Sequence, residues 1–312
     1  MTGTRAGLVL GLLFAIVLTA GSSVGSDAAS SPDLQPVRYS TVEEVAGPTV
    51  VAVGDIACPP GEPVTEDRCR HGDTASLAQS YTPDVVVGLG DLQYESGALS
   101  DFEASYDLSW GALKSVTKPV PGNHEYRTAD AAGYYAYFDD QSPGHPGYYA
   151  FNVANWRIYA LNSNCAKVNC ERQVRWLNRN MTANPRRCSA IMSHHPRFSS
   201  GGEHGSSTVV KPFWRIAVKH RADIALGGHD HDYERFRKMD AAGEPSPSGM
   251  VSFVSGAGGK SLYEFGTPLP GSLARDNHAP GVLALVLGKR RYSFEYRTID
   301  GQLVDSGIRR CV

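Results

Sequence analysis

The 312-residue sequence has almost no excess of charge of either sign and contains no long run of like charges. Thirty Lys and Arg side chains stand against 32 Asp and Glu side chains, which gives a formal net charge of −2 at pH 7. Proteins that bind nucleic acid usually carry a basic stripe or patch. The charge balance therefore predicts that nucleic acid is not the main partner, and it leaves room only for a local basic pocket that holds a phosphate group.

Motifs of familiar catalytic classes are also missing. Residues 48–312 contain neither a GxSxG nucleophile motif nor a phosphate-binding P-loop, which removes the obvious serine-hydrolase and P-loop mechanisms. No internal repeat occurs, and nothing inside residues 48–312 has the composition of a linker. A chain of this length can form one large domain or two small ones, and we predict a single domain over residues 48–312.

The amino-terminal segment has the order of a signal peptide. Arg5 precedes an almost unbroken apolar run that ends at Ala20, and small and polar residues follow as far as Ser31. The apolar run is at the short end for an uncleaved membrane anchor, which needs roughly 20 residues. We therefore predict a signal peptide over residues 1–28, with the cleavage site uncertain, and a linker over residues 29–47. The protein is expected to be secreted, with no stable membrane partner unless the segment stays uncleaved.

Cysteine is scarce, but its count is even. The six cysteines form no C-x-x-C pair, which argues against a zinc site. In an exported protein they suggest up to three disulfides, with 15 conceivable pairings. Closeness in sequence favours the pairs Cys58–Cys69 and Cys165–Cys170, which leaves Cys188–Cys311 to tie down the carboxyl terminus.

Short apolar runs rich in β-branched residues alternate with polar or helical stretches. A helix is predicted near Glu171–Met181, where apolar residues recur at helical spacing, and Asp300-Gly301 is a hairpin signal. The predicted strands are Thr49–Val53, Asp84–Leu89, Lys118–Pro121, Tyr148–Val153, Arg157–Leu161, Ala190–Ser193, Asp223–Leu226, Met250–Val254, Val282–Leu287, Tyr292–Arg297 and Leu303–Ser306. This order predicts an α/β fold, a layered α-β-β-α sandwich with two mixed β-sheets.

Polar side chains fall where these strands end. Asp55 and Asp91 each follow a Gly directly after an apolar strand. A single Gly-Asp pair is usually a turn, and a lone His is usually a surface or core residue. Five such pieces at strand ends instead predict one shared site, because ligand sites of α/β sheets collect beyond the carboxyl ends of the strands. The candidate metal ligands are Asp55, Asp91, Tyr94, Asn123, His194, His229 and His231.

This set of donors points to a particular chemistry. Two carboxylates, one amide, three imidazoles and a phenol are too many ligands for one catalytic metal, and they suit two adjacent ions that share a carboxylate. Hard oxygen donors together with imidazoles favour Fe, Mn or Zn. Two ions about 3.5–4 Å apart can hold a phosphate ester and lower the pKa of a shared water.

Five motifs carry these residues in order along the chain. They are Gly54-Asp55-Ile56-Ala57, Gly90-Asp91-Leu92-Gln93-Tyr94, Gly122-Asn123-His124-Glu125, Ser193-His194-His195-Pro196 and Gly228-His229-Asp230-His231-Asp232-Tyr233-Glu234-Arg235. With them the chain resembles the calcineurin-like metallophosphoesterases, and more closely their purple acid phosphatase branch. The motifs span residues 54–235, the resemblance extends through most of residues 48–312, and five motifs in family order are highly specific.

The resemblance implies two coordination spheres. By motif position, the first metal would be bound by Asp55, Asp91, Tyr94 and His231, and the second by Asp91, Asn123, His194 and His229, with Asp91 as the bridge. Tyr94 marks the branch, because purple members bind Fe(III) through a tyrosine three positions after the bridging Asp; the alternative is that Tyr94 packs under the site. The implied cofactors are Fe(III) and a divalent Fe, Zn or Mn.

The same resemblance assigns roles to three further histidines. His124 would orient the phosphate and protonate the leaving alkoxide, His204 resembles a second histidine that contacts substrate, and His195 would bind substrate or be structural. The implied step is in-line attack by a metal-bound hydroxide, with the metals and His124 stabilising the developing charge.

Two features depart from the family pattern. Ala57 stands where the family usually has Gly, a small change that leaves Asp55 free to bind. Residues 28–47 are too few for the β-sandwich domain that precedes the catalytic domain in plant purple acid phosphatases, so the phosphomonoester preference of the plant enzymes transfers poorly.

The sequence thus predicts a secreted, metal-dependent phosphoric ester hydrolase that acts on small phosphomonoesters, with residues 48–312 as its catalytic domain. One alternative is a phosphodiesterase or nucleotidase with the same two-metal site. A second alternative is an inactive secreted binding protein on the same fold.

Overall fold

The computed structural model describes residues 45–312. Residues 1–44, which include the predicted signal peptide and most of the predicted linker, lie outside the described residues. Within residues 45–312, no helix combines the length and the hydropathy that a bilayer crossing requires.

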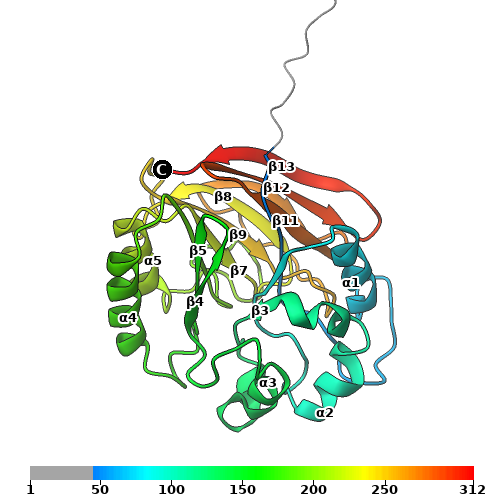
Figure 1. The fold of residues 1–312 in the computed structure, drawn as a ribbon. Coiled ribbons are helices and arrows are strands. Elements are labelled where there is room, and N and C mark those ends of the chain that lie inside the picture. The colour runs from blue at the N-terminus through cyan, green and yellow to red at the C-terminus, as the bar shows by residue number, and fades with distance from the viewer. Residues whose placement is uncertain (1–44) are drawn as a thin grey trace, which may run out of the picture. The chain divides into compact units, whose positions relative to one another are not determined.

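Two mixed β-sheets occupy the centre of the described region (Figure 1). One has six strands in the order β13-β12-β11-β1-β2-β3, and the other has seven in the order β10-β8-β9-β7-β6-β5-β4. The strands of the first are β1 (Thr49–Val53), β2 (Val85–Gly88), β3 (Thr117–Pro119), β11 (Gly281–Leu287), β12 (Arg291–Thr298) and β13 (Leu303–Arg310). Those of the second are β4 (Tyr149–Val153), β5 (Trp156–Ala160), β6 (Cys188–Met192), β7 (Ile224–Gly227), β8 (Tyr233–Met239), β9 (Met250–Ser255) and β10 (Ser272–Asp276).

Each sheet has a parallel part next to an antiparallel part. In the six-stranded sheet β1, β2 and β3 run parallel, and β11 pairs antiparallel with β1. In the seven-stranded sheet β5, β6, β7 and β9 run parallel, and β4 and β8 pair antiparallel at either side. The parallel strands place their carboxyl ends along one edge of each sheet, which is where the candidate ligands follow them.

The inner faces of the two sheets pack against each other. Val50 and Ala52 of β1 belong to the same core cluster as Ile158 of β5 and Met192 of β6, whereas Val51 belongs to a second cluster on the outer face. A strand buried on both faces needs apolar residues at every position. That requirement explains the unbroken apolar run of β1.

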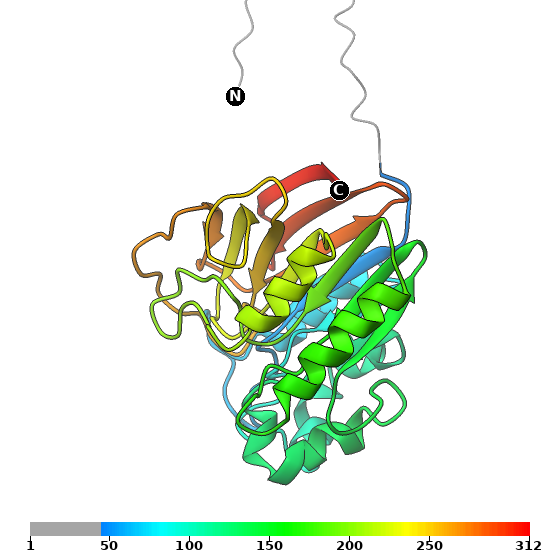
Figure 2. The same ribbon diagram turned by 90° about the vertical axis from the view of Figure 1, so that its left-hand side faces the viewer.

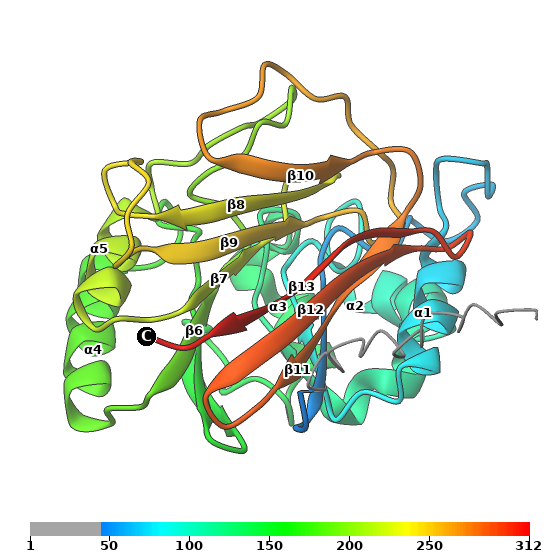
Figure 3. The ribbon, with the colours of Figure 1, turned by 90° about the horizontal axis from the view of Figure 1, so that it is seen from above.

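Helices cover the outer face of each sheet. The first face carries α1 (His71–Ser80), α2 (Leu99–Asp101), the π-helical turn Phe102–Tyr106, α3 (Ala132–Tyr137) and the 3-10 segments Trp110–Val116, Glu125–Arg127 and Ala129–Ala131. The second carries α4 (Cys170–Ala183) and α5 (Lys211–Lys219), which lie side by side in Figure 2. Seen from above, α4 and α5 lie on one side of the strands and α1 on the other (Figure 3). The predicted α-β-β-α layering is confirmed.

The predicted helix near Glu171–Met181 and the predicted strands all occur, with ends shifted by up to a few residues. Two strands, β8 and β10, and the helices α1, α2, α3 and α5 were not predicted. Strand β8 was missed because it contains charged residues. These residues are buried and have partners. The Glu234 carboxylate accepts a hydrogen bond from the Ser200 backbone N–H at 2.6 Å, and Arg235 forms an ion pair with Asp305 at 2.6 Å. Those partners lie far away in sequence, so alternation of polar and apolar residues could not reveal the strand.

The three predicted disulfides are all present: Cys58–Cys69, Cys165–Cys170 and Cys188–Cys311. The third joins the first residue of β6 to the residue that follows β13. It therefore links the seven-stranded sheet to the six-stranded sheet across 123 positions of sequence.

Candidate metal centre

The candidate ligands lie on tight turns that directly follow strands. Asp55 (φ 61°), Asp91 (φ 50°) and His229 (φ 74°) all have left-handed backbone conformations, which are uncommon for residues other than glycine and concentrate at functional sites. Gly122 allows close packing here, because a Cβ atom on it would lie 2.1 Å from Asp91 Oδ1. The strained turns direct the side chains into one common site beyond the strand ends.

One group of donors, meaning here the oxygen and nitrogen atoms that could bind a metal, lies around the phenol of Tyr94. Its hydroxyl donates to Asp55 Oδ1 at 2.9 Å and lies 2.9 Å from His231 Nε2. The other ring nitrogen of His231, Nδ1, lies 2.9 Å from Ser261 Oγ. This second contact fixes the ring so that Nε2 points at Tyr94 and Asp55.

A second group gathers around the imidazole of His194. Its Nε2 lies 3.0 Å from Asn123 Oδ1 and 3.1 Å from His229 Nδ1. Its Nδ1 lies 2.9 Å from the backbone carbonyl of Leu89. An N–H at Nδ1 satisfies that carbonyl, which directs Nε2 into the site, the orientation found in histidines that bind metals.

Asp91 connects the two groups. Its Oδ2 lies 3.3 Å from the Tyr94 hydroxyl and also 3.3 Å from His194 Nε2. The other carboxylate oxygen, Oδ1, accepts the backbone N–H of His124 at 2.8 Å. A single oxygen of Asp91 thus contacts both sets of donors, which is the position that a bridging carboxylate needs.

The electrostatics of the site favour a positive charge between these atoms. Burial acts to lower the pKa of His194, but the carboxylates of Asp91 and Asp55 outweigh it and raise the pKa to about 10. Burial raises the pKa of Tyr94, and the neighbouring carboxylates of Asp55 and Asp91 raise it further. Buried carboxylates that stabilise positive charge, set among imidazole nitrogens and an amide oxygen, are suited to bound cations. The donor set therefore fits two metal ions of the Fe, Mn or Zn type.

Glu125 supports the site from behind. This fully buried carboxylate accepts backbone N–H groups from Asp91 at 2.9 Å, Leu92 at 2.8 Å and Gly122 at 2.6 Å. Burial and the nearby Asp91 carboxylate raise the pKa of Glu125 to about 7. Glu125 belongs to the third sequence motif, but its role was not predicted.

His124 lies at the rim of the site, with its ring 4.3 Å from the ring of Tyr94. Its Nδ1 lies 2.7 Å from the backbone carbonyl of Glu95, and its Nε2 lies 3.1 Å from the Arg127 guanidinium and 3.9 Å from Asp91 Oδ2. The contact at Nδ1 leaves Nε2 as the nitrogen that faces the site.

The two remaining predicted histidines also reach the site. His204 stacks on the ring of His229 with a centroid distance of 4.1 Å, and the His195 ring lies 4.4 Å from that of His229. Ser163 Oγ lies 2.7 Å from His195 Nδ1. Burial, followed by the proximity of His194, lowers the pKa of His195 to about 3, so this ring contributes polarity without charge. All ten predicted site residues are therefore brought together.

Two neighbours of the site were not predicted. Tyr263 stacks on His231 at a centroid distance of 3.9 Å. The buried ammonium of Lys260 lies 5.1 Å from the centre of the Tyr94 ring and forms an ion pair with Glu95 at 2.6 Å. Both residues lie between β9 and β10, in a segment without a recognisable motif. No signal in the sequence could have located them.

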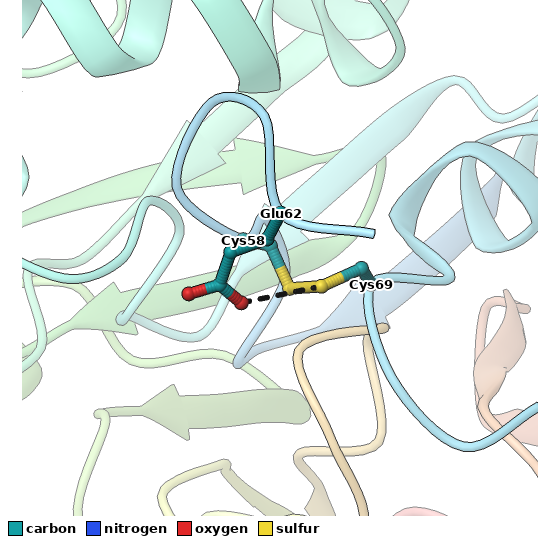
Figure 4. A group of neighbouring side chains, drawn as sticks. All are labelled: Cys58, Glu62 and Cys69. Atoms are coloured by element: carbon teal, nitrogen blue, oxygen red, sulfur yellow. Dashed lines mark hydrogen bonds between the residues drawn. A yellow bond between two sulfur atoms is a disulfide. The ribbon is translucent and has the colours of Figure 1, made fainter. Parts of the chain in front are cut away.

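A separate group of sulfur and carboxylate atoms resembles a metal site only in composition. Cys58, Glu62 and Cys69 lie together in the loop before α1 (Figure 4), and Glu62 Oε2 lies 3.5 Å from Cys69 Sγ. The two sulfur atoms are joined in a disulfide, so no thiolate is available to bind a metal. By contrast, Asp91, His194 and His229 form a cluster whose donor atoms all lie within 4.8 Å of one another.

The chain is similar in sequence to a probable purple acid phosphatase from a plant. It is 25% identical to probable purple acid phosphatase 20 of Arabidopsis thaliana over an alignment 192 positions long, which covers 53% of this chain and 43% of the relative. The chain thus matches less than half of the length of that protein.

Solved structures show the same fold. Purple acid phosphatase PPD1 from yellow lupin (Lupinus luteus) seeds has a TM-score of 0.68 at 19% identity, over 85% of this chain and 54% of that chain. GAP50, the anchor in the inner membrane complex of Plasmodium, has a TM-score of 0.62 at 14% identity, over 85% of this chain and 89% of that chain. At these identities the likeness concerns the fold alone.

The family described as calcineurin-like phosphoesterase matches residues 48–233. This segment is more than half of the 312 residues and contains all seven candidate ligands, from Asp55 to His231. We conclude that the chain belongs to the calcineurin-like phosphoesterase family.

Proposed function

We propose that this protein is a secreted phosphatase that hydrolyses phosphomonoesters at a site for two metal ions, in the manner of purple acid phosphatases. The observation that carries the proposal is the position of Asp91 Oδ2, 3.3 Å from both the Tyr94 hydroxyl and His194 Nε2. One shared carboxylate between two groups of donors suits a pair of adjacent ions. Residues 48–312 would form the catalytic domain, and the amino-terminal segment would direct export.

The residues divide between the two ions as the two groups of donors do. Asp55, Tyr94 and His231 would hold one ion, which we propose is Fe(III), because a phenolate is a hard donor. Asn123, His194 and His229 would hold the other, a divalent Fe, Zn or Mn. When bound, such ions supply Lewis acidity that neutralises phosphate charge and lowers the pKa of water.

The protein's own side chains would orient the substrate and move the proton. His124 is held through Nδ1 by the Glu95 carbonyl, so its Nε2 is placed to protonate the leaving alkoxide. Burial lowers the pKa of His124, and the Asp91 carboxylate opposes that effect. A group of lowered pKa is protonated only at acidic pH, which matches an acid phosphatase. His204 and His195, whose rings both lie against that of His229, would contact the substrate as well.

A phosphodiesterase or nucleotidase activity is the second candidate. It is favoured by a pocket of about 410 Å³ beside Asn123 and His195, which has room for a second ester group or a nucleoside. The convergence of all seven donors speaks against an inactive binding protein.

A substrate panel tests the proposal. The purified protein, loaded with iron and zinc, is assayed at acidic pH with an aryl monophosphate, a bis-aryl phosphate and nucleotides. We expect the highest kcat/KM for the monophosphate. A strong preference for the diester would overturn the phosphomonoesterase assignment. Unchanged turnover in both Asn123→Ala and His194→Ala would overturn the metal site itself.

A further inference from the structure

The pocket beside the metal centre is lined mostly by polar residues, among them one lysine. Its volume is about 410 Å³, and its walls include Asn123, His195, Ser207 and the ammonium-bearing side chain of Lys167. None of the residues that line it is acidic. Pockets of about 300–1,000 Å³ are typical of sites for small organic ligands. Because Asn123 and His195 also belong to the metal centre, a molecule in this pocket would lie next to the reacting phosphate.

The loop that carries Lys167 is fixed relative to the metal centre. The side chain of Asn164 donates to the backbone carbonyls of Pro121 at 3.1 Å and Gly122 at 3.3 Å, directly before the ligand Asn123. The Lys167 N–H donates to the Asn164 carbonyl at 2.8 Å. The disulfide Cys165–Cys170 closes the same loop. The backbone of Lys167 is therefore held at a set position with respect to Asn123.

The charge of Lys167 has no ion-pair partner within residues 45–312. Its side chain is exposed, and among residues 45–312 no carboxylate forms an ion pair with it. Most other cations around the site are paired: Lys260 binds Glu95 at 2.6 Å, and Arg127 lies 3.3 Å from Glu95. Lys167 is thus the cation of this pocket that is free to meet a negative group on a ligand.

We propose that this pocket binds the leaving group of the substrate and that Lys167 binds an anionic substituent on it. The substrate class is then a phosphomonoester whose organic part carries a second negative charge, either a carboxylate or another phosphate. This inference rests on the proposed phosphatase function and names the substrate class for the same site. Because Lys167 contacts only the part of the substrate that does not react, its effect falls mainly on KM.

A matched pair of substrates tests the proposal with the full metal-loaded protein. 4-Carboxyphenyl phosphate and 4-carbamoylphenyl phosphate differ in one charge and have nearly the same shape, and release of inorganic phosphate reports on both. We expect Lys167→Ala to lower kcat/KM for the carboxylated ester by about 3- to 5-fold, as for the loss of one solvent-accessible charge contact. The carbamoyl ester should change less than about 2-fold. Lys167→Glu should lower the value for the carboxylated ester further.

The control variant is Lys219→Ala. Lys219 is the last residue of α5 and contacts Asn178, so its removal changes the net charge equally but leaves the pocket intact. Equal effects of Lys167→Ala and Lys219→Ala on both esters, or no effect of Lys167→Ala, would overturn the assignment of the pocket. If wild-type protein released phosphate from neither ester, the proposed phosphatase function would fail, and this inference with it.

Discussion

The carboxylate of Glu125 holds the backbone of Asp91 in place, since Glu125 Oε2 accepts the Asp91 N–H at 2.9 Å. The same carboxylate accepts N–H groups from Leu92 and Gly122. The left-handed conformation of Asp91 (φ 50°) is costly on its own, by about 1–3 kcal/mol. Glu125 stabilises that conformation and so positions the carboxylate shared by the two groups of donors.

Replacement of Glu125 by Ala should therefore damage both stability and the metal site. The variant leaves at least three buried N–H groups without an acceptor, at a cost of about 1–3 kcal/mol for each group. We expect a loss of several kcal/mol in the free energy of unfolding and a lower bound-metal content, measured by denaturant titration and elemental analysis. Glu171→Ala is the control, because within residues 45–312 the Glu171 side chain forms only an exposed pair with Arg175. Normal metal content in Glu125→Ala would contradict the supporting role.

Tyr94→Phe should remove the colour of the iron form without unfolding the protein. Loss of the hydroxyl leaves the ring beside Lys260 and His124 but removes the phenolate that we propose as a ligand of Fe(III). We expect the visible charge-transfer band to vanish while other absorption persists. Tyr263→Phe should keep the band, because Tyr263 contacts His231 through its ring. A band of full intensity in an iron-loaded Tyr94→Phe variant would show that Tyr94 is not a ligand.

The disulfide that links the two sheets should stabilise the fold more than the short one. In the chain-entropy account, a loop of the length closed by Cys188–Cys311 contributes about 5 kcal/mol, and the short loop of Cys165–Cys170 about 2 kcal/mol. The double replacement Cys188→Ser/Cys311→Ser should thus lower the free energy of unfolding more than Cys165→Ser/Cys170→Ser. Denaturant titration of both variants, with metal present, measures the difference. Equal losses would contradict the ordering.

Asp223 should make the fold less stable as the pH rises. Burial raises the pKa of Asp223 to about 6, above the ordinary value near 4. The folded state therefore favours the neutral carboxyl, and the stabilisation present below about pH 4 is lost as the pH rises through 6. The change is on the order of 3 kcal/mol.

Asp223→Asn should remove this pH dependence. The measurement is the difference in unfolding free energy between wild type and variant from pH 4 to pH 7, which cancels the titration of the metal centre. Wild type should lose stability relative to the variant across this range. Parallel curves would show that the pKa of Asp223 is not raised.

Much of the site could be predicted from sequence because its ligands follow apolar strands directly. Asp55 stands one glycine after β1, and Asp91 follows β2 after Leu89 and Gly90. Parallel strands in one sheet bring such ends together. The disulfide pairs could be inferred because two of them are close in sequence. These features are local, or follow from the order of the strands.

The remainder depends on contacts between distant residues. The charged residues Glu234 and Arg235 disguise strand β8. Glu234 accepts hydrogen bonds from Ser200, and Arg235 forms an ion pair with Asp305, both from other parts of the chain. Lys260 and Tyr263 reach the site from a segment without a motif. Neither periodicity nor spacing carries information about such partners, which only the folded chain supplies.

The Cys188–Cys311 bond has a mechanical consequence. It joins the sheets where β6 begins, whereas His194 follows the opposite end of β6 and faces donors that come from the other sheet. The two sheets are thus held together covalently at one end, and the proposed metal ions would hold them together at the other. Removal of such ions should let the ligand-bearing turns of the two sheets move apart while the disulfide keeps the start of β6 in place. Amide exchange should then rise at these turns and stay slow at the start of β6.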